Sequence, residues 1–398
     1  MTSPLPRGSI GPLFWIFFKL GLTSFGGPTA HIAYYREAFV VKRDWLSEQA
    51  LADLLAVAQL LPGPTSSQIS MSIGAMRAGP VGAVAAWLAF SLPSAVLMVA
   101  FAFGLGAFDD PAASGWLSGL KLAALAVVAN ALLGMARTLA PDRARATIAA
   151  VAMALVVVVS GFAGQAAAIA VGAVVGVVMY RDRATAEAGL PMALVSRTFG
   201  IGCLGLFAIL IVALPVAVQV WDSPALGLID GLFRTGALVF GGGHVVLPLL
   251  ETVVVGPGFL DRETFVAGYG AAQALPGPLF TVSAFIGAAA APGLAGIGLA
   301  IACLVAIFLP GFLLVLGVLP FWAGLRDRPS VHGALTGVNA AVVGLLAAAL
   351  YDPVWTSAIG DPIDVALALA AFVALNRWRV PSWVVVAGLA AVGAVLAY

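Results

Sequence analysis

The sequence predicts an all-α protein that crosses a membrane many times, built from two inverted-topology repeats with broken or re-entrant helical hairpins. Three observations lead to this fold class. Of the 398 residues, 62% are hydrophobic and 9% are charged, whereas soluble domains carry about 25% charged residues. An unusual glycine and proline phrase occurs twice, about 215 residues apart. Basic residues gather in loops that alternate with acidic or uncharged connections.

Long apolar stretches supply the predicted membrane crossings. The first set is Val81–Phe108, Trp116–Leu139, Thr147–Phe162, Ala166–Tyr180 and Thr198–Trp221. The second set is Leu294–Trp322, Leu335–Tyr351, Ile363–Leu375 and Trp383–Tyr398. Several are shorter than the roughly 20 residues of an ordinary span, so we expect these to be tilted, paired or partly interfacial.

The doubled phrase interrupts apolar sequence at matching places. Its first copy is Phe25, Gly26, Gly27 and Pro28, followed by Gln59, Pro62, Gly63 and Pro64. Its second copy is Phe240, Gly241 and Gly242, followed by Gln273, Pro276, Gly277 and Pro278. Glycine and proline are poor residues for a helix interior, and in lipid a broken backbone persists only where protein or a water-filled cavity satisfies it. Paired interruptions in the two halves of a chain indicate the substrate site of a transporter.

Other matches between the halves keep the same order and nearly the same offset. The pairs are Lys19 with Arg234, Gly21 with Gly236, Gly79 with Gly293, Pro93 with Pro310 and Leu120 with Leu335. A shared bias toward small residues explains scattered matches but not a fixed order, which favours duplication. We therefore expect a first repeat over residues 1–190, a linking transmembrane helix over residues 191–226 and a second repeat over residues 227–398.

Charge orients these repeats. Basic loops contain Arg137, Arg143 and Arg145; Arg181, Arg183 and Arg197; Arg326 and Arg328; and Arg377 and Arg379. By the positive-inside rule they are cytoplasmic. The stretch Val81–Phe108 then runs outward and its partner Leu294–Trp322 runs inward, so the repeats are inverted. We expect a multi-pass protein of a bacterial inner membrane with a cytoplasmic N-terminus and a periplasmic C-terminus.

The segments around the first copy of the phrase are short. Residues 12–36 and 45–78 flank the breaks with about 12–17 residues each, or roughly 18–25 Å of helix, which is less than a full span. One interpretation is two re-entrant hairpins that enter from the cytoplasm, with their second-half partners entering from outside. The other is genuine broken spans. Both place the tips near the middle of the membrane.

Each Pro-Gly-Pro ends one helix and begins another. After the first come Thr65, Ser66 and Ser67, which offer hydroxyl donors beside unpaired backbone N–H groups and a positive dipole end. This combination suits an oxyanion. The second copy retains only Thr281 and Ser283 there, so we expect unequal half-sites. The alternative is that these polar residues only satisfy broken backbone.

Charged and amide side chains near the breaks are further candidates. Lys19 and Arg234 could supply positive charge inside the membrane, where a cation is a functional candidate by default, or could snorkel to an interface. Gln59 and Gln273 could direct amide donors toward the tips or cap helix ends. Acidic residues are few, with Asp53 and Glu251 as possible proton carriers or interfacial groups. His31 and His244 do not make a metal site without further ligands.

Several function classes are disfavoured. The net charge of +1 gives no reason to expect nucleic acid as a partner. Cys203 and Cys303 lie in apolar sequence and suit buried core thiols rather than a metal or cofactor site. No phosphate-binding loop motif is present, which argues against direct drive by ATP. A membrane-embedded enzyme would need a nucleophile–base pair or a metal cluster, and neither is found.

The two copies of the phrase resemble the chromate ion transporter family, in its long-chain type with two homologous halves. The resemblance covers nearly the whole chain and is carried by Phe25-Gly26-Gly27-Pro28, by Gln59 with Pro62-Gly63-Pro64, and by their second copies. It implies export of chromate across the inner membrane driven by the proton-motive force, chromate resistance, and sulfate as a structural analogue. Gly243 stands where the first copy has Pro28, which departs from an equal pair.

The sequence therefore leaves three hypotheses about transport. The leading one is a secondary transporter that exports chromate, with protons as a coupling ion and the lipid bilayer as its environment. Sulfate uptake and a passive oxyanion channel are the alternatives. Oligomeric state stays open, with a homodimer among the choices.

Overall fold

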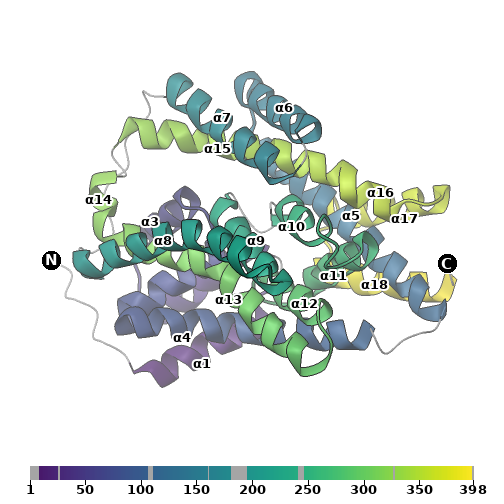
Figure 1. The fold of residues 1–398 in the computed structure, drawn as a ribbon, viewed down its shortest axis with the longest axis horizontal. Coiled ribbons are helices and arrows are strands. Elements are labelled where there is room, and N and C mark those ends of the chain that lie inside the picture. The colour runs from purple at the N-terminus through teal and green to yellow at the C-terminus, as the bar shows by residue number, and fades with distance from the viewer. Residues whose placement is uncertain are drawn as a thin grey trace.

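The computed structural model describes residues 9–25, 27–105, 111–159, 161–180, 195–240, 246–325 and 328–396. This described part is helical throughout and contains no strand, which confirms the all-α fold class (Figure 1). Five of its helices are long and apolar enough to cross a membrane: Thr65–Leu105, Gly115–Leu139, Arg197–Trp221, Gly293–Phe321 and Pro329–Ala358. Of the predicted functional residues, Gly26, Gly241, Gly242, Gly243 and His244 lie outside the described residues, as do Arg181, Arg183 and Arg326 of the basic loops.

The first half supplies helices α1 to α7. Their bounds are α1 Ile10–Thr23, α2 Gly27–Tyr35, the π-helical turn η1 Arg36–Val41, α3 Glu48–Leu60, α4 Thr65–Leu105, α5 Pro111–Leu139, α6 Arg143–Val158 and α7 Phe162–Met179. The long helix α8, Arg197–Trp221, then leads to the second half.

The second half repeats this order but is divided into more elements. Its bounds are α9 Pro224–Leu238, α10 Val246–Val254, α11 Arg262–Ala274, η3 Leu279–Thr281, α12 Val282–Ala289, α13 Gly293–Val318, η4 Leu319–Phe321, α14 Trp322–Leu325, α15 Pro329–Ala349, η5 Leu350–Trp355, α16 Thr356–Ala358, α17 Pro362–Asn376 and α18 Ser382–Leu396. Helices α3 and α11 are each 13 residues long and end just before a Pro-Gly-Pro.

Helix α4 is two helices joined by a sharp turn. Ala78 and Gly79 leave helical geometry, and Gly79 has a φ of +64°. The chain then folds back, so that a Cβ on Gly74 would lie 2.2 Å from the carbonyl oxygen of Gly82. Gly293, the counterpart of Gly79, has a φ of +56° and separates α12 from α13 in the same way. Both positions need glycine because side chains disfavour positive φ.

The short segments at the breaks are helical hairpins. Phe17 of α1 packs against the rings of Tyr35 and Phe39, with centroids 6.2 and 5.1 Å away, so the chain reverses between them. Arg77, which ends the first part of α4, lies 4.2 Å over the ring of Trp45, just before α3. The second hairpin therefore begins and ends at the same level. These reversals favour the re-entrant interpretation over spans that continue in one direction.

The two halves interleave through their long helices. Helix α15 packs on α6 and α7 of the first half, and α5 packs on α17 and α18 of the second (Figure 1). Glycines allow the close approach: a Cβ on Gly337 would lie 1.9 Å from the carbonyl oxygen of Gly172, and one on Gly119 would lie 2.1 Å from that of Leu389. Contacts between small residues are the usual means of helix association in membranes.

Candidate functional site

The two Pro-Gly-Pro turns lie against the helix breaks of the opposite halves. The backbone N–H of Gly63 donates to the carbonyl oxygen of Val239 at 2.7 Å, and that of Gly277 donates to Ser24 at 2.9 Å. Val239 and Ser24 are the residues that follow the ends of α9 and α1. Four breaks that are far apart in sequence are therefore joined in reciprocal pairs.

Glycine is required at both turns. Gly63 has a φ of +129° and Gly277 a φ of +94°. A Cβ on Gly63 would lie 2.9 Å from the Cα of Gly311 in α13, and one on Gly277 would lie 2.9 Å from Oγ of Ser94 in α4. Each turn thus fits against the long helix of the other half, which explains why this motif sits in apolar sequence.

The N-terminus of α4 is buried at the first turn. Thr65, Ser66 and Ser67 are 5%, 4% and 0% exposed. The first N–H groups of a helix have no partner within it, and Pro64 before them has no side-chain acceptor to cap them. Within the described residues the hydroxyl of Ser67 is also without a hydrogen-bond partner. This end of α4 therefore combines backbone donors, a hydroxyl and a positive dipole end in one buried place.

Gln68 fixes this turn. Its Nε2 donates to the carbonyl oxygen of Pro62 at 2.8 Å, so an amide inside the helix closes the Pro-Gly-Pro loop. Tyr35 supports the same turn from α2, because its hydroxyl donates to the carbonyl oxygen of Ser66 at 3.1 Å. Sequence reasoning missed Gln68 and Tyr35. The position of Gln68, one turn after the motif, is the signal that could have found it.

The two hydroxyls at the second turn are already engaged. Thr281 donates its hydroxyl to Pro278 at 2.9 Å, and Ser283 donates to Phe280 at 2.8 Å. Both hydroxyls thus bond the nearby backbone, which is the alternative role considered for them. Pro276, Gly277 and Pro278 are buried, like Gly63 and Pro64.

Carbonyl groups at the tips are satisfied by protein. The carbonyl oxygen of Ser24 accepts from Gly277 and also from Nε2 of the buried His31, 3.1 Å away. Val239 accepts from Gly63, and Pro62 accepts from Gln68. These carbonyl acceptors already have donors, whereas the first N–H groups of α4 have no acceptor within their own helix. The local balance therefore favours an anion. This arrangement also gives His31 a structural role.

The two predicted cations occupy different surroundings. Lys19 is exposed and shares its helix face with Trp15 and Leu22, which are 59% and 46% exposed. That position favours the snorkelling interpretation. Nε of Arg234 donates to both carboxylate oxygens of Asp230, each 3.0 Å away. Asp230 was missed from sequence, although its spacing of four residues from Arg234 on one helix is a signal for an ion pair.

The remaining predicted residues surround the tips unequally. Gln59 is exposed, whereas Nε2 of Gln273 is buried and has no hydrogen-bond partner within the described part of the chain. The ring of Phe25 packs on Trp383 of α18 at 6.1 Å, and Phe240 is half-buried. Gly27 and Pro28 belong to the first turn of α2.

Of the two acidic candidates, Asp53 is 6% exposed, and Glu251 forms an ion pair with Arg262 at 3.0 Å.

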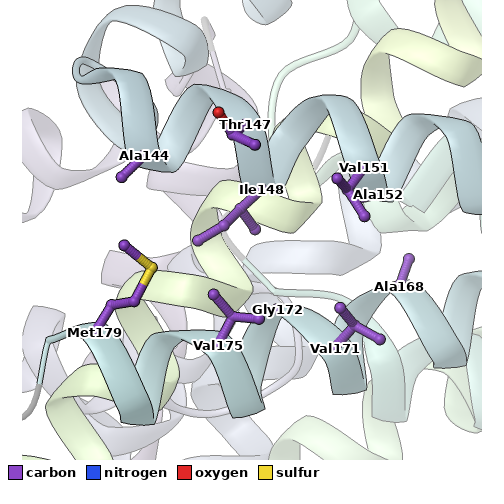
Figure 2. A pocket seen from close by; sticks show the side chains of 10 residues that line it. All are labelled: Ala144, Thr147, Ile148, Val151, Ala152, Ala168, Val171, Gly172, Val175 and Met179. Atoms are coloured by element: carbon purple, nitrogen blue, oxygen red, sulfur yellow. The ribbon is translucent and has the colours of Figure 1, made fainter.

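One hollow of the described structure is apolar and lies away from the tips. This groove, of about 370 Å³, runs between α6 and α7 (Figure 2). It is lined by Ala144, Thr147, Ile148, Val151, Ala152, Ala168, Val171, Gly172, Val175 and Met179. Thr147 brings the one hydroxyl among these side chains, so the groove does not suit an oxyanion.

Comparison with known proteins assigns the chain to a family. Residues 11–177 and 226–394 each match the family described as chromate transporter. The chain is 29% identical to a chromate transport protein of Pseudomonas aeruginosa, over 97% of this chain and 92% of that protein. It is 27% identical to a chromate transport protein of Cupriavidus metallidurans, over 98% and 94% of the two chains. No solved structure matches it. The protein is a multi-pass membrane protein that belongs to the chromate transporter family.

Proposed function

We propose that this protein exports chromate, a divalent tetrahedral oxyanion, and binds it at the meeting point of the helix tips. The observation that carries the proposal is the buried N-terminus of α4, where Ser67 has an unpartnered hydroxyl in the described structure and the preceding residue, Pro64, has no side-chain acceptor for the first N–H groups. An oxyanion supplies the acceptors that these donors lack. Family membership and relatives named for chromate transport support chromate as the anion.

Export is favoured by the charge of the substrate. Moving two negative charges out of a cell that is negative inside releases roughly 4.6 kcal/mol per 100 mV. Uptake would have to work against that energy with several cotransported cations. We therefore assign the driving force to the electrical part of the proton-motive force at the inner membrane.

The paired turns supply a route for alternating access. Each turn is bonded to the break of the other half, so a movement of one half displaces the tips of both. Related repeats that move around a fixed central site are a common transporter mechanism. We assign the stronger binding of the anion to the first half, which carries Thr65, Ser66 and Ser67.

The test is flux through purified protein in proteoliposomes of one orientation, with pH and voltage set independently. We expect saturable chromate exit from the side that corresponds to the cytoplasm, accelerated by an inside-negative potential. Flux unchanged by voltage would contradict electrogenic export. Unsaturated flux far above about 10³ ions per second, the upper range of ordinary turnover numbers, would indicate a channel. Sulfate measured in the same vesicles decides between the two anions.

A further inference from the structure

Two ion pairs occupy equivalent places in the two halves with their charges exchanged. Nε of Arg36 donates to Oε2 of Glu48 at 3.1 Å, and Nη2 of Arg262 pairs with Oε1 of Glu251 at 3.0 Å. Glu48 and Arg262 are the first residues of the 13-residue helices α3 and α11. Arg36 and Glu251 stand 215 residues apart, which is also the offset between Lys19 and Arg234. The hairpins of both halves are thus tied by the same contact with opposite polarity.

In the second half a third charge extends the pair. Nη1 of Arg262 donates to Oδ1 of Asp352, 2.6 Å away, just beyond the end of α15. Nearby, Lys121 of α5 pairs with Glu263 of α11 at 3.3 Å. Deeper in, Leu120 of α5 covers α11 so closely that a Cβ on Gly270 would lie 2.4 Å from its carbonyl oxygen. Helix α11 is therefore held against α5 and, through Arg262, against η5.

The residue equivalent to Asp352 is Arg137, at the same 215-residue offset, in the last turn of α5. Its charge is opposite to that of Asp352, just as the charge of Glu48 is opposite to that of Arg262. A pair between Glu48 and Arg137 would therefore be attractive. In the described residues Arg137 is exposed and has no ion pair, and Glu48 is bonded to Arg36 alone.

The faces of α3 and α11 also differ in burial, because the face of α11 is covered and that of α3 is exposed. Val266 of α11 is buried and Gly270 is covered by α5. Their equivalents in α3, Ala52 and Ala56, are exposed. Figure 1 shows α3 lying apart from α15, whereas α11 packs on α5. The side that carries α11 is closed in this structure, and the side that carries α3 is open.

We propose that Glu48 and Arg137 form the ion pair that closes the side of the protein that carries α3, as Arg262 and Asp352 close the side that carries α11. The proposal rests on the alternating-access function above and assigns Glu48 and Arg137 as positioning residues of the transport cycle. An ion pair at an exposed surface is weak, so such a contact can form and break in each cycle. The hydrogen bonds from Arg36 hold the carboxylate of Glu48 in position.

Cross-linking tests this without measuring transport. In a background with Cys203→Ala and Cys303→Ala, the pair Glu48→Cys with Arg137→Cys is treated in membrane vesicles with a short bifunctional thiol-reactive reagent, whose two maleimide groups each add one cysteine thiol. We expect a cross-link that grows with time as the closed state is visited. Arg262→Cys with Asp352→Cys is the positive control, because those positions already touch. Glu48→Cys with Thr138→Cys is the matched control, because Thr138 is exposed beside Arg137 but directed elsewhere on the helix.

A second arm uses charge. Arg137→Glu should lower chromate flux about tenfold if it lowers the population of the closed state by that factor. Adding Glu48→Lys to the same chain should restore part of the flux. A 48–137 yield no higher than the 48–138 yield, with a strong 262–352 control, would overturn the gate while leaving chromate transport standing. Absence of chromate flux in the parent protein, with the 48–137 cross-link present, would instead refute the proposed substrate and keep the gate.

Discussion

The backbone N–H of Gly63 donates to the carbonyl oxygen of Val239 across the boundary between the halves, at 2.7 Å. Gly277 makes the equivalent bond to Ser24 at 2.9 Å. A buried carbonyl at the end of a helix is costly when it has no donor, and in lipid no water replaces one. Each half therefore satisfies the broken backbone of the other. This reciprocity gives a physical reason for keeping both copies of the phrase in one chain.

The first prediction concerns this bond. Gly63→Ala should abolish transport and lower the melting temperature in detergent, because a left-handed position costs a side chain about 1–3 kcal/mol and the added Cβ meets backbone at Gly311, 2.9 Å away. Gly202→Ala is the control, since that glycine has open space around it in α8. Thermal unfolding measured beside chromate flux checks both. A Gly63→Ala protein as stable and active as the control would show that the turn is not held in this conformation.

The second prediction concerns the candidate anion site. Ser67→Ala should raise the KM for chromate by about tenfold, because a hydrogen bond to a charged group contributes about 1.5–3 kcal/mol. Ser70→Ala is the matched control in the same buried helix, since the hydroxyl of Ser70 already donates to the carbonyl oxygen of Ser67 at 2.8 Å. Initial rates at a series of chromate concentrations separate KM from the maximal rate. Equal KM values for the two variants would remove Ser67 from the site.

The sequence allows the helices to be predicted, and its repeats allow the paired breaks to be located. Apolar length identifies the crossings because the bilayer core fixes it, and Gly79 with Gly293 marks equivalent turns because both adopt positive φ. The contacts between breaks could not be predicted. Bonds such as that from Gly63 to Val239 depend on how two halves fit together, and no local pattern encodes this. The exposure of Lys19 likewise depends on which helix face finds a neighbour.

The third prediction concerns Arg234. Arg234→Ala leaves the carboxylate of Asp230, 16% exposed, without the partner that bonds it at 3.0 Å, so the melting temperature should fall. Adding Asp230→Asn should recover most of the loss, because it removes the uncompensated charge. A double-mutant cycle on melting temperature and on chromate KM measures the coupling. If the double variant regains stability but not KM, Arg234 also acts on the anion; recovery of both assigns it to structure.

The fourth prediction separates Lys19 from its counterpart. On an exposed face shared with Trp15 and Leu22, the ammonium can reach the membrane surface along its own stem. Lys19→Ala should therefore leave chromate KM within about twofold of the parent, since surface substitutions away from special features usually change free energies by less than about 0.5 kcal/mol. Lys19→Glu tests charge at the same place. A large rise in KM for either variant would return Lys19 to the substrate path.

The last prediction concerns the packing of α15 on α7. A Cβ on Gly337 would lie 1.9 Å from the carbonyl oxygen of Gly172 and 2.7 Å from the Cα of Gly176. Backbone cannot move aside as a side chain can, so Gly337→Ala must push the two helices apart and lose their van der Waals contact. Gly134→Ala, in open space on α5, is the control and should stabilise its helix slightly. Melting temperatures in detergent should fall for the first and hold or rise for the second. An unchanged melting temperature for Gly337→Ala would mean that α7 and α15 do not touch in the membrane.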